Sequence, residues 1–189
     1  MWNSMTDRPI QRIYVGEYFF SEEPVELKTL LGSCVSVCLF DSVSRFGGMN
    51  HILLPGSPSD TNTDFSTRFG VHAMEILINE FVKRGIPRKN LSAKIIGGGQ
   101  IMTMSPELSI GAKNIYFARS FLEGEEIPII AEEVGGQFYR NLRFFSDTAE
   151  VFVRRERTDF ERKTIERQEQ EYLRELERNI TGHSSVIFF

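Results

Sequence analysis

The sequence contains only two cysteines, Cys34 and Cys38, among its 189 residues. If the segment that holds them is a β-strand, their Cα atoms lie about 13 Å apart at about 3.3 Å per residue. That separation is far beyond the reach of about 7 Å that a disulfide allows. A fold held together by a disulfide is therefore excluded as long as this segment is extended.

Motifs for metal ions are also missing, because the chain has no CxxC pair and no HxxxH pair. The residues that could still form a zinc site are Cys34, Cys38, His51 and His72. Their spacing matches none of the known structural zinc sites. We therefore expect neither a metal ion nor an organic cofactor.

Long apolar runs and an excess of one charge are lacking as well. No run approaches the roughly 20 apolar residues of a membrane helix, and residues 1–16 do not have the basic-then-apolar layout of a secretion signal. A net charge of −4 gives no general reason to expect binding to nucleic acid. We expect a cytoplasmic protein that neither inserts into a membrane nor binds nucleic acid.

The pattern of apolar residues predicts an α+β fold of mixed sheets layered with helices. Period-two alternation predicts strands, and spacing of three and four predicts helices. The expected strands are 10–20, 24–31, 35–40, 48–54, 94–96, 127–133, 137–145 and 150–154; those at 35–54 and 137–154 form hairpins. One helix has the buried stripe Met74, Leu77, Ile78 and Phe81, and a second spans 110–122. Residues 56–67 are expected to form a polar loop.

The sequence becomes rich in charged residues after residue 155. We therefore divide the chain into a domain of residues 1–155 and a C-terminal segment of residues 156–189. A Thr158/Glu161 capping box predicts the start of a long, highly charged helix. Its thin apolar stripe is Ile165, Tyr172, Leu173, Leu176 and Ile180, and the chain ends in an apolar tetrad at 186–189. Two interpretations stay open: a solvated helix packed on the domain, or an element that binds a partner.

The strand that carries Cys34 begins unusually, because Gly32 and Ser33 interrupt an apolar run just before the cysteine. In the expected hairpin, a loop of two residues at 42–43, or of four at 41–44, places Cys34 opposite His51. A register two residues away keeps the two diagonal on one face, whereas a loop of odd length separates them. An ordinary hairpin can therefore bring a thiol and an imidazole together.

Such a pair has a chemical use. A free thiol has a pKa near ~8.5, and a nearby imidazolium lowers that pKa and favours the nucleophilic thiolate. The histidine can then protonate a leaving group and activate water. Gly32, Ser33 and Cys34 could supply backbone N–H donors for an oxyanion. The alternative is plain packing, since most buried cysteines are inert and a lone histidine on a strand is usually structural.

Several segments, taken in order, resemble one family. They read LLGSCVSVCLFD, GGMNHILLP, IIGGGQIM, IGAKNIYFARSFL, IPIIAEEVGGQFYRNLRFF and EVFVRR. Over about residues 12–155 the chain is similar to the CheD-type chemoreceptor glutamine deamidases. The resemblance implies a protein-glutamine amidohydrolase of bacterial chemotaxis. Such an enzyme converts glutamine side chains on the cytoplasmic helices of methyl-accepting chemotaxis proteins to glutamate and releases ammonia. Some members of the family also hydrolyse methyl esters.

The same resemblance implies that Cys34 is the nucleophile and His51 its partner, within a fold similar to a toxin-type cysteine deamidase. A third family residue, a threonine, falls on Thr29, although some relatives have it one position earlier, where this chain has Lys28. Thr29 would orient His51, with Ser33 as the alternative. Some relatives also bind a CheC-type phosphatase, so a regulatory binding module with little catalysis is the competing function.

Overall fold

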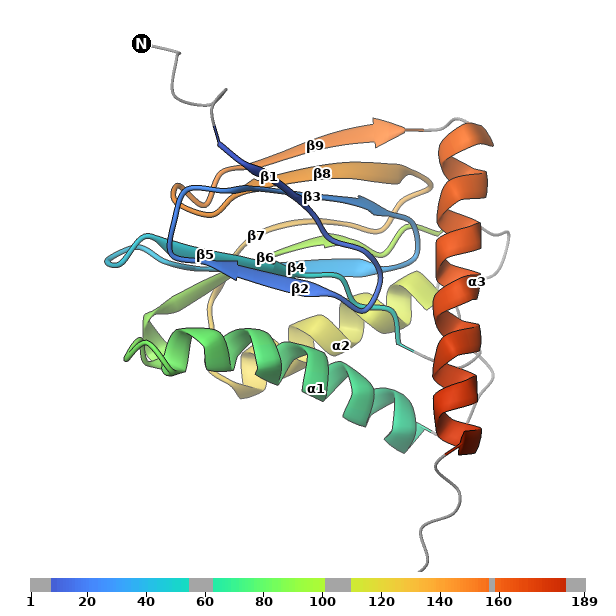
Figure 1. The fold of residues 1–189 in the computed structure, drawn as a ribbon, viewed down its shortest axis with the longest axis horizontal. Helices are drawn as coiled ribbons and strands as arrows, with labels where there is room; N and C mark the ends of the chain where they lie inside the picture. The colour runs from blue at the N-terminus through green and yellow to red at the C-terminus, as the bar shows by residue number, and fades with distance from the viewer. Residues whose placement is uncertain (1–7, 55–62, 101–109, 157–158, 183–189) are drawn as a thin grey trace, which may run out of the picture.

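The computed structural model describes residues 8–54, 63–100, 110–156 and 159–182. Two β-sheets lie one over the other, two helices cover the free face of one sheet, and a third helix stands across one end of both sheets (Figure 1). Each sheet contains one parallel pair of strands, β1 with β3 and β6 with β7, and its other pairs are antiparallel. The predicted α+β fold with mixed sheets is confirmed.

The elements are bounded as follows. The first sheet has the order β1 (Ile10–Arg12), β3 (Glu26–Leu31), β8 (Tyr139–Phe145) and β9 (Val151–Glu156). The second has the order β2 (Tyr18–Ser21), β5 (Phe46–Asn50), β4 (Val35–Asp41), β6 (Leu91–Gly97) and β7 (Ile129–Val134). The helices are α1 (Thr63–Val82), α2 (Ile110–Gly124) and α3 (Asp159–Gly182), with a short 3-10 turn at Arg88–Asn90.

Alternation along β4 divides the interior into two cores. Val35, Val37 and Leu39 point toward α1 and α2, and pack there with the predicted stripe of α1, whose four residues are all fully buried. Cys34, which directly precedes the strand, and Cys38 point the other way, into the core between the two sheets. Because successive side chains of a strand alternate between faces, β4 is buried on both sides and reads as a nearly continuous apolar run.

Two expectations about elements are wrong. Residues 10–20 do not form one strand: the chain turns at Gly16, where φ is +82° and Glu17 N–H donates to Tyr14 O, so β1 and β2 join different sheets. Period-two alternation cannot distinguish one strand from two strands with a turn between them. The expected polar loop at 56–67 lies partly outside the described residues, and its last part, from Thr63, is already helical in α1.

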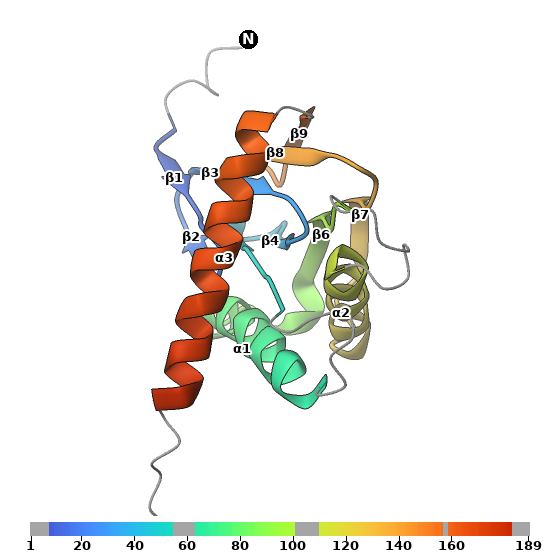
Figure 2. The same ribbon diagram turned by 90° about the vertical axis from the view of Figure 1, so that its right-hand side faces the viewer.

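Helix α3 packs against the body of the protein across the end of the sheets at which β3 ends and β4 begins (Figures 1 and 2). Ile165 is buried, and Tyr172 and Leu173 pack against the core between the sheets. The capping residue Thr158, the side chains of Leu176 and Ile180, and the tail 186–189 lie outside the described residues. In the part of the chain that is described, no helix is long and apolar enough to cross a membrane.

The three glycines at 97–99 join the two sheets at the same end. Gly98 N–H donates to Cys34 O at 2.7 Å, and Gly99 N–H donates to Gly32 O at 2.7 Å. Gly97 has φ of +118°, and a Cβ there would lie 2.3 Å from the carbonyl oxygen of Cys34. The segment therefore needs glycine to approach the cysteine turn, and no phosphate-binding role is required to explain it.

The close approach of Gly97 to the cysteine turn predicts that alanine is tolerated less well at Gly97 than at Gly124. Gly97→Ala should lower the free energy of unfolding by about 1–3 kcal/mol, because it combines a strained φ with a clash against backbone. Gly124→Ala is the matched control: a Cβ there meets nothing within 4 Å, so its free energy of unfolding should stay the same or rise slightly. Denaturant unfolding measures both, and equal effects would contradict the packing described here.

Candidate active site

Cys34 and His51 lie on the same side of the second sheet. Val35 and Ile52 exchange both backbone hydrogen bonds, so Cys34 stands opposite Leu53 and diagonal to His51. Asp41 pairs with Phe46, which leaves a loop of four residues two positions away from the register that would oppose Cys34 and His51 directly. The predicted shared face is confirmed, and both side chains are buried, at 0% and 2% exposure.

A threonine sets the orientation of His51. Thr29 Oγ1 lies 2.8 Å from His51 Nδ1 and donates to the carbonyl oxygen of Ile13 at 2.7 Å. A hydroxyl has one proton, and a carbonyl oxygen can only accept, so that proton goes to Ile13. Nδ1 must therefore carry the hydrogen of the shared contact, which leaves the lone pair of the ring on Nε2.

That lone pair is buried without a partner. His51 Nε2 has no hydrogen-bond partner among the described residues. Burial lowers the pKa of His51 to about 4, although the backbone carbonyl of Ile13 acts in the opposite direction. At neutral pH the ring is thus an uncharged base. An unsatisfied buried nitrogen costs stability, so its presence calls for an explanation such as a chemical use.

The backbone carbonyl groups of the turn that carries Cys34 all accept hydrogen bonds from other parts of the protein. Gly32 O and Cys34 O accept from the glycine segment, and Ser33 O accepts from Asn114 Nδ2 at 2.9 Å. Asn114 is fully buried, and its Oδ1 also accepts from the N–H of Leu54, close after His51. Because all three successive carbonyl groups have partners, the turn is held in place, and the N–H groups of Ser33 and Cys34 can serve a common acceptor.

In this structure that acceptor is a carboxylate of α3. Cys34 Sγ donates to Glu169 Oε1 at 3.1 Å, and Ser33 Oγ lies 3.0 Å from Oε2. The backbone N–H groups of Ser33 and Cys34 face the same carboxylate and act to lower its pKa. These hydrogen bonds lower the pKa of Glu169, but its burial has the larger effect and raises that pKa.

The thiol is not ionised in this arrangement. Burial raises the pKa of Cys34 well above its usual value, and the charge of Glu169 and its hydrogen bond raise it further. The expectation that an imidazolium lowers the pKa of Cys34 is therefore not met while α3 covers the turn, because His51 is neutral there and Glu169 is the polar partner of the thiol. Ser33 likewise bonds to Glu169, whereas Thr29 contacts His51.

The other residues considered for a metal site are dispersed. Cys34 and Cys38 are free thiols, burial raises the pKa of Cys38, and His72 is exposed on α1. Within the described ranges, no three His, Cys, Asp or Glu side chains gather as metal ligands would.

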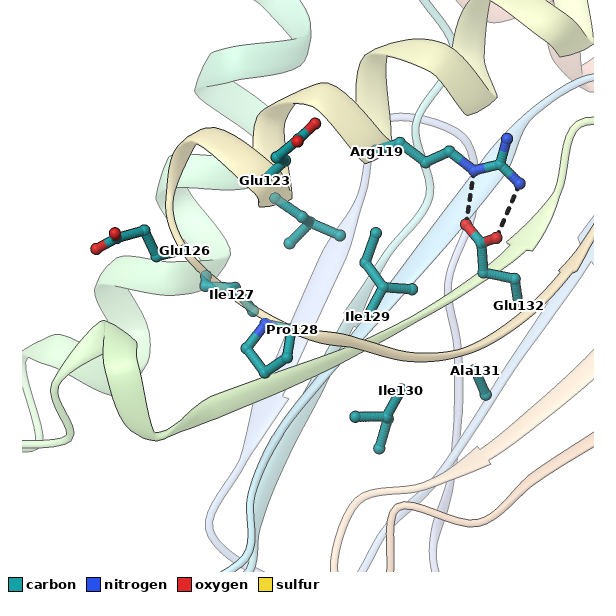
Figure 3. Close-up of a pocket in the computed structure, with 10 residues that line it drawn as sticks. Arg119, Glu123, Glu126, Ile127, Pro128, Ile129, Ile130, Ala131 and Glu132 are labelled. Carbon is teal, nitrogen blue, oxygen red and sulfur yellow. Dashed lines mark hydrogen bonds and ion pairs between the residues drawn. The ribbon is translucent and has the colours of Figure 1, made fainter.

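One surface hollow lies away from this site, between the end of α2 and β7 (Figure 3). Its floor is apolar, with Ile127, Pro128 and Ile129, and an ion pair between Arg119 and Glu132 lies at its rim. It contains no nucleophile and no histidine, so it does not compete with Cys34 as a catalytic site.

Two residues of the site were missed from the sequence. Asn114 gave no signal, because an asparagine on a helix resembles any exposed polar residue until its burial is known. Glu169 lay within a run of charges, but it stands four residues after Ile165 and four before Leu173. That spacing places it on the apolar stripe of α3, and could have singled it out.

With this geometry established, similarity to other proteins decides the family. The family model described as CheD chemotactic sensory transduction matches residues 53–155. A protein of Thiobacillus denitrificans named "Probable chemoreceptor glutamine deamidase CheD" is 37% identical over 179 residues, which is 94% of this chain and 88% of the relative. The chain belongs to the CheD family.

Other CheD relatives agree. Proteins of the same printed name from Methylobacillus flagellatus and Laribacter hongkongensis are 39% and 41% identical, over 94% and 80% of this chain and 88% and 77% of theirs. A match to 94% of the chain leaves out fewer residues than the 24 of α3, so the relatives from Thiobacillus denitrificans and Methylobacillus flagellatus align with at least part of this helix. Bacillus licheniformis YfiH is a solved structure with 16% identity, a TM-score of 0.41, and coverage of 62% of this chain and 49% of its own.

The neutral state of His51 predicts a pH dependence. In the unfolded chain a histidine has a pKa of about 6.5, and in the folded protein that of His51 is lowered to about 4. Between these values the unfolded state binds a proton that the folded state does not, so stability is lost as the pH falls from about 6.5 to 4. This contribution should reach a few kcal/mol, and H51Q should lack it.

Denaturant unfolding of wild type and H51Q across this pH range measures the effect as a difference curve, in which the carboxylates common to both proteins cancel. H72Q, at an exposed histidine of α1, is the matched control and should keep the wild-type slope. Parallel curves for wild type and H51Q would contradict a neutral, buried imidazole.

Proposed function

We propose that this protein is a chemoreceptor glutamine deamidase, which converts glutamine side chains on the cytoplasmic helices of chemoreceptors to glutamate and releases ammonia. The observation that carries the proposal is the combination of a nucleophile and a base on one face of a sheet: Cys34, on a turn with aligned N–H donors, and His51, with a buried lone pair on Nε2. The family and the names of its relatives support the substrate class. Because the proposed substrate helices are cytoplasmic, the proposal includes a reaction in the cytoplasm.

The reaction follows from the roles that the geometry allows. His51 Nε2 takes the proton of the Cys34 thiol, and the resulting thiolate attacks the amide carbon of the glutamine side chain. The N–H groups of Ser33 and Cys34 stabilise the oxyanion. The imidazolium, oriented by Thr29, gives its proton to the departing ammonia, and a water that His51 deprotonates then hydrolyses the thioester to glutamate and free thiol.

The test is to incubate the protein with the cytoplasmic fragment of a receptor and measure glutamine-to-glutamate conversion by mass spectrometry of its peptides. C34A should abolish conversion, and H51Q should slow it by about 10²- to 10⁴-fold. Cys38 is the matched control: C38A removes a buried thiol outside the proposed machinery and should retain conversion. Identical receptor spectra from wild type and C34A would end the proposal.

Thr29 gives a finer prediction. T29V removes the hydroxyl that accepts from His51 Nδ1, so it should reduce kcat by at least about 10-fold through loss of a hydrogen bond to the imidazolium. T29S retains the hydroxyl and should recover most of the rate. Because Thr29 acts through His51, KM should change little in both variants. Equal kcat values for T29V and T29S would show that Thr29 only packs.

The competing function is a regulatory module that binds a CheC-type phosphatase without catalysis. Charged residues on the exposed part of α3, such as Arg167 and Glu171, could form such an interface. A binding module, however, has no use for an unsatisfied ring nitrogen beside a fixed cysteine turn. We therefore favour the enzyme, with CheC-type binding as an additional property that C34A would leave intact.

A further inference from the structure

Glu169 of α3 contacts the proposed nucleophile, Cys34, and the neighbouring Ser33. The carboxylate of Glu169 accepts from the thiol of Cys34 and from the hydroxyl of Ser33, and the backbone N–H groups of both residues lower its pKa. Glutamate is the product of glutamine deamidation, and its side chain has the length and the acyl group of the substrate. Glu169 thus presents a product-like group to the nucleophile and to the oxyanion donors together.

The buried face of α3 is centred on this residue. Ile165 lies four positions before Glu169, and Tyr172 and Leu173 lie three and four after it, which are the spacings of one helix face. Ile165 is 2% exposed, and the two later residues pack against the core between the sheets. The ring of Tyr172 lies so close to Gly16 that a Cβ there would be 2.3 Å away, so the body of the protein is shaped to receive this helix.

A purely structural helix would not need a carboxylate at this position. Taking a carboxylate out of water is costly, and an apolar side chain in the same place is usually at least as stable. Among the side chains of α3 that the structure describes, Lys163, Arg167, Gln170 and Glu171 are exposed. Of the acidic side chains of α3 whose exposure is described, Glu169 is the one that is partly buried, and it lies against the nucleophile.

The same helix closes the site. Cys34 and His51 are 0% and 2% exposed, so the side chain of a receptor glutamine has no route to the thiol while α3 is in place. For the proposed reaction to occur, α3 has to move off the turn that carries Cys34.

We propose that α3 is an intramolecular pseudosubstrate, seated over Cys34 as a receptor helix is seated during deamidation, with Glu169 in the place of the target glutamine. The proposal rests on the proposed function and extends it to the form of the substrate. The target glutamine lies within an apolar stripe, with apolar side chains four residues before it and three and four residues after it. Receptor helices compete with α3 for one site, and α3 is not consumed because residue 169 is already an acid.

The sharpest test turns the pseudosubstrate into a substrate. In E169Q, the amide carbon of Gln at position 169 lies beside Cys34 Sγ. The thiolate forms a thioester as the C–N bond breaks, ammonia leaves with a proton from His51, and water hydrolyses the thioester to glutamate and thiol. The net reaction consumes one water and releases one ammonia, and peptide mass spectrometry of purified E169Q should find glutamate at position 169.

Two control variants give this experiment its specificity. The double variant C34A/E169Q should retain the amide, and E171Q, with its change on the exposed face of α3, should retain the amide at position 171. Conversion in E169Q should follow first-order kinetics with a rate constant that is independent of protein concentration, as an intramolecular reaction requires. A rate that rises with protein concentration would overturn the proposal.

A second measurement separates failure of this proposal from failure of the proposed function. E169A removes the hydrogen bonds that hold α3 on the cysteine turn, so alkylation of Cys34 at neutral pH should become at least about 10-fold faster than in wild type or E171A. The kcat/KM for a receptor fragment should rise with it. If receptor glutamine is converted to glutamate but the amide of E169Q is not, the pseudosubstrate proposal is overturned and the deamidase function stands. If neither is converted, the deamidase function fails, and an unchanged alkylation rate in E169A would also refute closure by Glu169.

Discussion

The antiparallel pairing of β4 with β5 is the constraint on which the remainder of the site depends. The exchange of hydrogen bonds between Val35 and Ile52 places Cys34 and His51 on one face, and a register shifted by one residue would place them on opposite faces. This register is strongly specified, because the same alternation sends Val35, Val37 and Leu39 into the core under α1 and α2. The free energy that fixes the hydrophobic core therefore also fixes the site.

Around that pairing, the backbone carbonyl groups of the cysteine turn hold it in place, and its N–H groups are the proposed oxyanion donors. The carbonyl groups of Gly32, Ser33 and Cys34 bond to the glycine segment and to Asn114, which holds the turn rigidly against β6 and α2. Rigid donors are what electrostatic catalysis needs, because they do not have to reorganise when charge develops. Asn114 also bonds to the backbone just beyond His51, so one buried amide couples the segment of the nucleophile to that of the base.

Much of this could be predicted from the sequence, since it depends on local pattern. Period-two alternation and a short loop located the hairpin of Cys34 and His51, and the stripe from Met74 to Phe81 located α1. What failed depends on distant partners. Tyr14 to Glu17 turn because β1 and β2 join different sheets, which no local pattern records. The contact of Glu169 with Cys34 joins residues 135 positions apart.

The protonation states of Cys34 and His51 depend on their surroundings as well as on each other. The sequence motif predicts a thiolate beside an imidazolium, a state that needs each charge to stabilise the other. In the closed structure the thiol donates to Glu169, and burial favours the neutral imidazole, so each group has the protonation that suits its surroundings without the other. Removing Glu169 from the turn takes away a negative charge and a hydrogen bond that both favour the thiol. Departure of α3 would thus expose Cys34 and lower its pKa in a single step, because the helix that blocks access also buries the thiol and holds the carboxylate of Glu169 against it.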